Sequence, residues 1–432
     1  MPLKRQIGLW SAVFLGLGSM MGAGLYVSLA LAAGLCGPAV VVAISVAGLL
    51  ALSNGLSSAQ LAAAHPVSGG TYAYGYRYLN GPLGFLAGWL FLLAKSASAA
   101  TAALGMAGYL LQALERDGQT EQIVVALVGV AVFTIIVMVG IRASSRVNIV
   151  IVSLTLLTLV LFVLLAMEPA RVNGPEHLQP FFHSEQGGDR AYLWNFLQGC
   201  ALLFVAYTGY GRIATLGEEI RNPSRTIPAA IVITLIITMV IYAAIGYVSI
   251  AAVSTESFAE SVDEQAAVLE VVTKQFAFGP AVRIVAAGAI AAMAGVLLNL
   301  ILGLSRVVLA MGRQGDLPAG LAKIGPKSQM PRRAVLMSAL IIIVLVVIGD
   351  VRVTWSFSAF CVLIYYGLTN ICALRLNQSE RRFPRWIAVL GLIGCFFLAF
   401  QVPVLIWLVG LGMVVCGFLW RFAIHRFRIR HV

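Results

Sequence analysis

The feature that most constrains this chain is a succession of apolar runs, each long enough to cross a lipid bilayer. A hydrocarbon core of roughly 30 Å takes about 20 helical residues to cross. Backbone groups in lipid must be satisfied within the segment, and these runs lack the alternation of barrel strands, so each run is predicted to be a helix. We predict an all-α integral membrane protein of about twelve transmembrane helices, near residues 9–32, 39–63, 83–111, 122–141, 147–167, 192–216, 228–251, 280–312, 334–349, 354–374, 386–402 and 404–423.

The amino-acid composition agrees with this class. Hydrophobic residues make up 60% of the 432 residues and charged residues only 11%, which leaves too little polar surface to cover a globule in water. No soluble domain is expected, and residues 1–432 are predicted to form one transmembrane domain. The first span lacks a small-residue cleavage site, so we do not expect it to be removed as a signal peptide.

The distribution of charge predicts the orientation in the membrane. Lys and Arg accumulate on cytoplasmic loops, and with the N-terminus inside, 22 of the 29 cationic residues fall in predicted cytoplasmic segments. Orientation therefore explains the net charge of +12, and no nucleic acid partner is predicted. We expect an integral protein of the plasma membrane, the inner membrane of the cell, with both termini cytoplasmic.

Two glycine-rich stretches interrupt otherwise ordinary spans. Residues 16–24 (GLGSMMGAG) lie in the middle of the first span, and residues 204–211 (FVAYTGYG) lie in the sixth. Glycine loosens a helix, and unwound backbone at membrane depth is tolerated only where it lines a cavity or is buried in protein. Inverted-repeat transporters place such breaks at corresponding positions of two halves.

Breaks of this kind suit a zwitterionic ligand. The N-termini of half-helices present N–H groups and a positive dipole end to a carboxylate, while exposed carbonyls suit an ammonium. An amino acid carries both groups. The alternative is that the glycines only allow close packing, as in a small-xxx-small pattern, and the spacing from Gly18 to Gly22 fits that pattern.

At these residues the sequence resembles the amino acid-polyamine-organocation superfamily, nearest to its cationic-amino-acid-transporter-like and L-type amino acid transporter branches. Residues 18–26 (GSMMGAGLY) resemble the first-helix motif of the family. Residues 66–74 (PVSGGTYAY), followed by Gly88-Trp89, resemble the loop into the third helix. Residues 204–228 resemble the sixth-helix signature, and residues 305–318 resemble the end of the eighth helix.

The resemblance implies the five-plus-five inverted-repeat fold of the bacterial leucine transporter, with discontinuous helices 1 and 6. Residues 1–170 would form the first repeat (helices 1–5) and residues 190–376 the second (helices 6–10). Residues 384–423 would add two further helices.

The resemblance also implies a binding site. In relatives the first helix holds the substrate carboxylate, and the sixth helix holds the amine and supplies a hydrophobic lid. The carboxylate end would comprise Ser19, Met20, Gly22, Ala23 and Gly24. The amine end would comprise Phe204, Val205, Ala206, Tyr207 and Thr208, with Gly209 as the hinge.

Two departures from the family pattern bear on the substrate. Many relatives carry Asp or Asn where this chain has Gly211, and a Glu where it has Gln60. A buried ammonium or guanidinium needs a counter-charge. We therefore expect a neutral amino acid rather than a cationic one.

Lys95 lies near the centre of the third predicted span, where an ammonium costs at least about 2.5–3.5 kcal/mol on insertion scales. A lysine that alternates between wet and dry surroundings can take up and release a proton, which makes Lys95 a candidate coupling residue. The alternative is a structural lysine bonded to helix-end carbonyls, or one that snorkels to the interface. Some relatives use a fifth-helix lysine in place of sodium, but that position here corresponds to Thr155, so Lys95 does not inherit this role by motif.

Sodium coupling of the leucine-transporter type would use hydroxyls of the eighth helix, yet residues 286–304 contain neither Ser nor Thr. Proton symport or exchange is therefore favoured. On the cytoplasmic side a charged cluster is either an inner-gate ion network or ordinary surface polarity; it consists of Arg212, Glu218, Glu219, Arg221 and Arg225. Residues 257–275 are predicted to form an outer amphipathic helix, with Val262, Leu269 and Val272 as its apolar contacts.

The sequence thus predicts a secondary active transporter that moves a neutral L-amino acid by alternating access, proton-coupled or as an exchanger. The expected partners are the amino acid, the lipid bilayer and, as a candidate, protons. A transporter of a polyamine or a charged amino acid and a non-transporting sensor remain as alternatives. The spans offer no paired carboxylates, metal ligands or nucleophile–base sets, and the six cysteines have no metal-ligand spacing. No enzyme activity, metal or cofactor is expected.

Overall fold

The computed structural model of the protein describes residues 5–116, 118–181, 188–260, 268–276, 278–325, 330–348 and 350–429. These residues form helices, turns and two isolated bridges, Ile7 with Ile220 and Ser68 with Leu216. The predicted all-α class is confirmed. The elements are α1 (Leu9–Met20), η1 (Gly24–Ser28), α2 (Leu29–Cys36), η2 (Gly37–Ala39), α3 (Val40–Ala64), α4 (Thr71–Tyr78), α5 (Gly81–Ala113), α6 (Gln119–Val139), α7 (Ile141–His177), α8 (Gly188–Tyr207), η3 (Thr208–Tyr210), α9 (Gly211–Thr215), η4 (Gly217–Glu219), α10 (Pro223–Ala252), α11 (Thr255–Glu260), α12 (Val268–Thr273), α13 (Ala281–Gln314), η5 (Ala319–Ala322), α14 (Arg332–Ile348), α15 (Val351–Leu374), α16 (Arg385–Ala399) and α17 (Val404–Ile429).

Eight helical stretches among the described residues are long and apolar enough to cross a membrane. The first of them, Leu9–Ala64, runs through α1, α2 and α3 as one stretch of 56 residues, where the sequence predicts two spans. Helix α16 is apolar but only 15 residues long. The eight stretches are Leu9–Ala64, Gly81–Ala113, Gln119–Val139, Ala143–His177, Pro223–Ala252, Ala281–Gln314, Val351–Leu374 and Val404–Ile424. The number twelve and the five-plus-five repeat stay predictions.

Helix α7 extends ten residues beyond its predicted end at residue 167. Proline inside a helix removes a backbone hydrogen bond and favours termination, yet α7 continues through Pro169 and Pro175 to His177. Tertiary contacts accompany the extension. Asn173 Nδ2 donates to the carbonyl of Ala252 at 3.0 Å, and Nδ1 of His177 lies 3.2 Å from the carbonyl oxygen of Ala251. Contacts with α10 thus compensate for the weak local signal.

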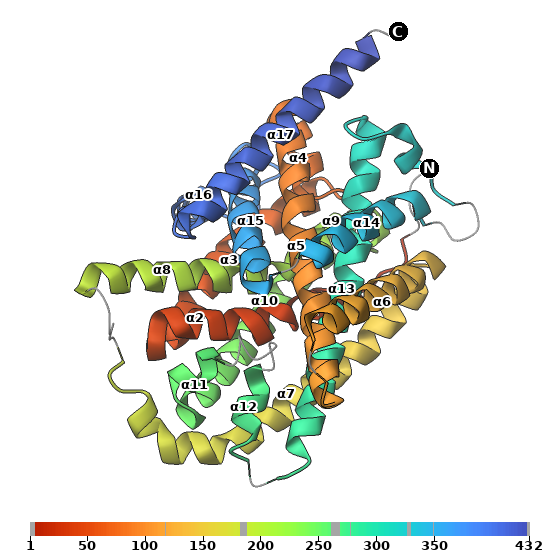
Figure 1. Cartoon of the computed structure of the whole chain (residues 1–432). Coiled ribbons are helices and arrows are strands. Elements are labelled where there is room, and N and C mark those ends of the chain that lie inside the picture. Colours follow the sequence, from red (N-terminus) through yellow and green to blue (C-terminus); the bar gives the residue numbers. More distant parts are fainter. Residues whose placement is uncertain are drawn as a thin grey trace.

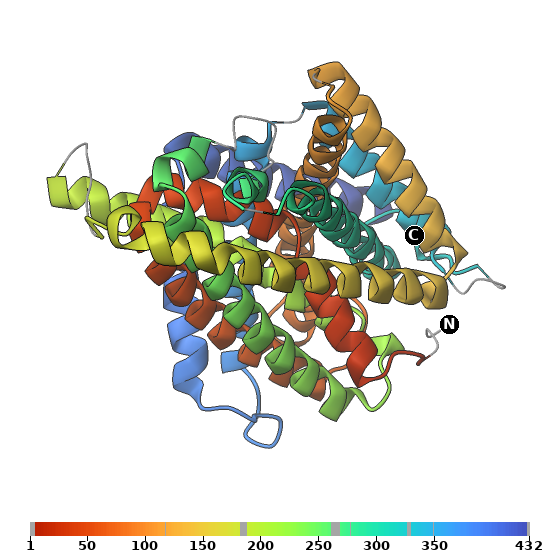
Figure 2. The same cartoon turned by 90° about the horizontal axis from the view of Figure 1, so that it is seen from below.

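Burial divides the apolar helices into inner and outer ones. In α5, α13 and α15, 78% of the most apolar window is buried, against 33% in α7 and 11% in α17. Helix α5 packs against both α13 and α15, and α5 and α13 lie together in the middle of the molecule in Figure 1. Helix α17 follows the upper edge in Figure 1, and α7 runs along one face in Figure 2. An apolar helix with an exposed apolar face is suited to contact with lipid.

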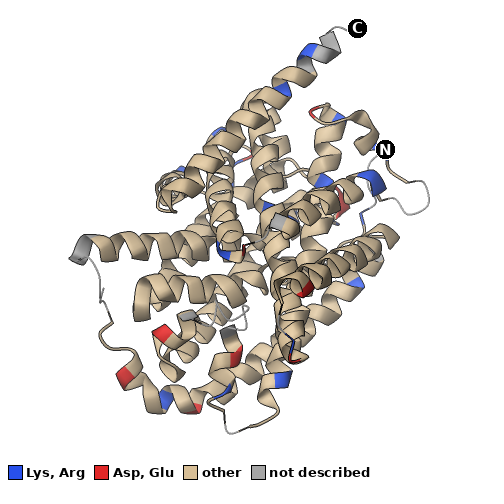
Figure 3. Ribbon diagram, viewed as in Figure 1, with Lys and Arg blue, Asp and Glu red and all other residues tan. Residues whose placement is uncertain are grey.

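Charged residues lie mostly in loops and at helix ends, while the helix bodies are almost free of them (Figure 3). This pattern is expected for helices whose middles are solvated by hydrocarbon, where a charge is costly. The exceptions are therefore informative. Lys95 in α5, Arg212 in α9 and Arg306 in α13 are buried, and all three lie near the site described next.

Candidate functional site

The first helix is interrupted where the glycine cluster predicts it. Helix α1 ends at Met20, and Met21 and Gly22 form a bend in which the Gly22 N–H donates to the Met20 carbonyl at 2.8 Å. The chain then continues as the π-helical turn η1. A π-helical turn within a helix is rare and is found often at functional sites.

The sixth span is interrupted less severely. Helix α8 ends at Tyr207, the 3-10 turn η3 covers Thr208–Tyr210, and α9 resumes at Gly211. Because a 3-10 turn keeps most of its carbonyls engaged, this break is a tightening of the helix rather than an unwound segment. Gly209 brings the two breaks together, since a Cβ there would lie 2.7 Å from the Ser19 carbonyl carbon and 2.6 Å from Met20 Cγ.

Glycines of the first cluster also permit close packing, which was the alternative interpretation. A Cβ on Gly22 would lie 2.3 Å from Val296 Cγ2 of α13. One on Gly24 would lie 2.6 Å from the Cβ of Ala206 in α8. Packing and interruption therefore coexist in this cluster and do not exclude each other.

A small cavity lies between the two breaks. Most of the residues predicted to bind substrate line it, together with Lys95. Four further residues, which the sequence analysis missed, come from α5, α13 and α15. The lining comprises Ser19, Met20, Ala23, Gly24, Lys95, Ser98, Val205, Ala206, Thr208, Val296, Leu300 and Trp355. Only Ser98, one turn from Lys95 in α5, had a usable sequence signal, because residues three apart share a helix face.

The remaining predicted site residues lie behind this lining. Gly22 faces α13, and Gly209 supports Ser19 and Met20. The Phe204 ring meets Tyr366 edge to face, with ring centroids 5.8 Å apart. Tyr207 points toward α3, where its hydroxyl donates to the Ile44 carbonyl at 3.2 Å. These four residues pack behind the residues that line the cavity.

The volume of the cavity is about 20 Å³. This is close to the minimum that holds one water molecule, and it is too small for an amino acid. The cavity as the structure has it therefore has no room for a ligand of that size.

Lys95 lies in the cavity wall and is 5% exposed. Its Nζ donates to Thr208 Oγ1 at 2.6 Å, and Thr208 Oγ1 donates to the Val205 carbonyl at 2.6 Å. The side chain does not snorkel to the interface, because it ends at the sixth-helix turn. Lys95 makes no ion pair with any described residue.

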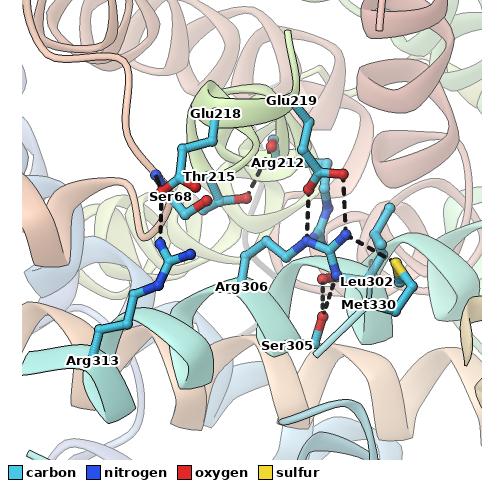
Figure 4. A network of polar contacts seen from close by, with 10 residues as sticks. All are labelled: Ser68, Arg212, Thr215, Glu218, Glu219, Leu302, Ser305, Arg306, Arg313 and Met330. Atoms are coloured by element: carbon cyan, nitrogen blue, oxygen red, sulfur yellow. Dashed lines mark hydrogen bonds and ion pairs between the residues drawn. The ribbon is translucent and has the colours of Figure 1, made fainter. Parts of the chain in front are cut away.

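Two ion pairs connect η4 to α13 (Figure 4). Glu219 Oε1 and Oε2 accept hydrogen bonds from Arg306 Nε at 2.7 Å and Nη2 at 3.1 Å, and both side chains are buried. Glu218 pairs with Arg313 at 2.8 Å and also accepts from the Ser68 backbone N–H at 3.2 Å. These contacts join the η4 segment to α13 and to the loop before α4.

The predicted inner cluster is thus present in part. Its two glutamates form ion pairs, but the partners are Arg306 and Arg313 of α13 rather than neighbours in sequence. Arg221 and Arg225 form no ion pair within the described residues. The Arg221 backbone N–H donates to the Ile7 carbonyl at 2.8 Å. Only a signal for contact between residues 87 and 95 positions apart would have identified these partners.

The predicted outer amphipathic helix corresponds, within the described residues, to the two short helices α11 and α12. Leu269 and Val272 of α12 are fully buried, as predicted. Val262 lies outside the described residues.

Known proteins resemble nearly the whole chain. The amino acid permease family matches residues 7–420. An uncharacterized transporter of Mycobacterium tuberculosis is 40% identical, over 93% of this chain and 87% of the relative. The branched-chain amino acid permease BcaP of Bacillus subtilis is 27% identical, over 96% of this chain and 92% of the relative. Human cationic amino acid transporter 4 is 30% identical, over 88% of this chain and 61% of the relative.

These relatives are all named as transporters or permeases, and their matches span most of the chain. The matched family and the long apolar helices both indicate a membrane protein that transports a solute. A buried cavity between two helix breaks fits the same class. The chain therefore belongs to the amino acid permease family of the amino acid-polyamine-organocation superfamily, and it is an integral membrane transporter rather than an enzyme.

Proposed function

We propose that this protein is a secondary active transporter that moves a neutral L-amino acid by alternating access between two inverted five-helix halves. The observation that carries the proposal is the cavity between the first-helix bend and the sixth-helix turn. In the proposed complex, residues 204–208 hold the amine and cover the apolar side chain. The substrate carboxylate is held by Ser19, Met20, Gly22, Ala23 and Gly24. Gly209 serves as the hinge of the sixth helix.

The charge of the cavity supports a neutral substrate. Its lining includes one cation, Lys95, and no Asp or Glu. A lysine or arginine substrate would place a second cation there without a counter-charge, which is unfavourable in a buried site. A zwitterion offers a carboxylate to the same environment. The relative named as a branched-chain amino acid permease is consistent with this choice.

We further propose that the Glu219–Arg306 pair closes the site toward the cytoplasm, in a plasma membrane with both termini inside. Positive-inside orientation supports this assignment. With this pair formed and the cavity contracted, the conformation corresponds to one closed toward the cytoplasm. Transport would require the pair to separate and the cavity to widen.

Lys95 is the proposed coupling residue. It is buried, it lines the cavity, and its hydrogen bond to Thr208 joins it to the turn that would move. Proton gain or loss at Nζ would change that hydrogen bond, because a neutral amine can accept as well as donate. Such a link would connect protonation to the geometry of the sixth helix. Exchange of amino acids without net proton movement is the alternative mode.

The test is flux into liposomes containing the purified protein, for radiolabelled neutral, acidic and basic amino acids and putrescine, with and without a pH gradient. Neutral amino acids should be taken up, and a gradient with the acidic side outside should accelerate uptake. Lys95→Ala should reduce the gradient-driven part by about tenfold or more, since it removes a charge-assisted hydrogen bond. Lys274→Ala, at an exposed lysine, is the matched control.

Two results would contradict these proposals. Uptake of arginine or putrescine in preference to neutral amino acids would exclude the neutral substrate. An unchanged pH response in Lys95→Ala would exclude Lys95 as the coupling residue.

A further inference from the structure

Arg212 is a buried cation that the proposed transport cycle does not use. It is the second residue of α9, directly after the sixth-helix turn, and it is 3% exposed. Within the described residues its guanidinium makes no ion pair, and its Nε and Nη1 have no hydrogen-bond partner. Sequence reasoning placed Arg212 in the inner ion cluster, but the glutamates of that cluster pair with Arg306 and Arg313 instead.

An unpaired buried guanidinium is unfavourable for folding. Its charge is retained in proteins, and its planar fork of N–H donors matches the two oxygens of a carboxylate. Well-packed apolar residues usually stabilise such a position better than a charge does. A guanidinium whose Nε and Nη1 lack a partner among the described residues in one conformation therefore suggests an anion that arrives in another.

The position of Arg212 indicates where in the protein the anion would bind. A Cβ on Gly303 of α13 would lie 1.0 Å from Arg212 Nη1, so the guanidinium occupies the space that a side chain at Gly303 would fill. Leu300 and Arg306 lie one turn to either side of Gly303 on the same face of α13. Leu300 lines the cavity and Arg306 pairs with Glu219. These contacts place Arg212 between the cavity and the ion pair. Figure 4 shows Arg212 beside that pair.

We propose that Arg212 is a second docking point for the substrate carboxylate, on the path between the central cavity and the Glu219–Arg306 pair. The inference rests on the proposed function, because it takes an amino acid as the ligand. When the pair opens, the carboxylate leaves the first-helix bend and is received by the guanidinium. Arg212 would then lower the barrier for a charged group that crosses a dry segment of the path.

The docking role of Arg212 can be tested by measuring transport from each face of the membrane separately. Uptake kinetics are measured in right-side-out and inverted membrane vesicles, for the transported amino acid, in the parent and in Arg212→Gln. Loss of a charge-assisted hydrogen bond should raise the KM about tenfold at the face closed by the ion pair. The KM at the opposite face should stay within about twofold, since the central cavity is unchanged. Arg332→Gln, at an exposed arginine outside the predicted ion cluster, should alter neither value.

Two further variants separate docking from a structural role. Gly303→Ala keeps the charge but displaces the guanidinium, and it should reproduce the one-sided rise in KM. Arg212→Met should leave the melting temperature in detergent unchanged or higher, because it removes a buried unpaired charge. A fall in melting temperature together with an equal rise in KM at both faces would show a structural role and overturn the inference.

The outcomes also separate this inference from the proposed function. If the parent transports no amino acid, the proposed function fails. If the parent transports one and Arg212→Gln shows the parental KM at both faces, only the docking role of Arg212 is wrong.

Discussion

At the scale of single residues, glycine is used here to bring backbones together. Gly209 lies so close to the first-helix bend that any side chain would overlap backbone atoms of Ser19. Lys95 shows the complementary principle, since its long apolar stem lets the ammonium reach Thr208 from a neighbouring helix. Both residues act where the two interrupted helices meet. Substitutions there should affect transport more than the same substitutions elsewhere.

Gly209→Ala should reduce transport because its Cβ would lie 2.8 Å from the Ser19 carbonyl oxygen. Overpacking of this kind costs typically about 1–3 kcal/mol, so we expect a loss of stability in that range and an uptake rate about tenfold lower. Uptake into liposomes and thermal unfolding in detergent measure the two effects. Gly412→Ala is the control, because nothing lies within 4 Å of a Cβ at that helical position. Equal behaviour of the two variants would disprove the role of the close approach.

At the scale of elements, the buried ion pair joins two segments that the chain separates widely. Glu219 belongs to η4 and Arg306 to α13. The Glu219 side chain is 3% exposed and the Arg306 side chain is 0% exposed. Removal of one partner from a buried pair leaves the other charge uncompensated. The pair is thus a connection between elements whose loss should be felt by the whole fold.

Glu219→Gln should destabilise the protein by about 3–5 kcal/mol, because Arg306 would remain buried without a counter-charge. Thermal or denaturant unfolding in detergent measures the change. The control is Glu121→Gln, which disrupts an exposed pair with Arg116 at 4.0 Å and should cost less than about 1 kcal/mol. Similar stability of the two variants would contradict the importance of burial for this pair.

At the scale of the whole molecule, apolar surface is distributed as a bilayer requires. The inner helices α5, α13 and α15 surround the site, whereas α7 and α17 present apolar side chains outward. Charge is confined mainly to the ends of helices and the loops (Figure 3). The excess of cations in the predicted inner segments then determines which way the molecule is expected to face.

The proposed topology predicts the location of the C-terminus. With twelve spans and the N-terminus inside, a C-terminal green fluorescent protein fusion should fluoresce and a C-terminal alkaline phosphatase fusion should be inactive. Placement of the termini on the same side follows from an even number of spans and the positive-inside bias. An active phosphatase fusion would show an odd number of spans or the opposite orientation.

The sequence by itself determined the all-α class, the approximate positions of the long apolar helices and the location of the two breaks. These are local properties, because hydrophobic length and glycine content act within one segment. It also identified Lys95 and most residues of the cavity wall, although only through resemblance to a family for the substrate-binding stretches. Local signals misjudged the extension of α7 past two prolines, and they did not predict the short helix α4.

Tertiary structure alone decided which residues meet. Lys95 bonds to Thr208, 113 positions away, and Arg306 rather than a neighbouring arginine pairs with Glu219. The same packing places Arg212 between the cavity and that pair. Its Nε and Nη1 have no hydrogen-bond partner within the part of the chain that the structure describes. No pattern within one segment specifies such contacts, because they depend on how several helices pack at once. The sequence determined what each helix is, and packing determined what the site contains.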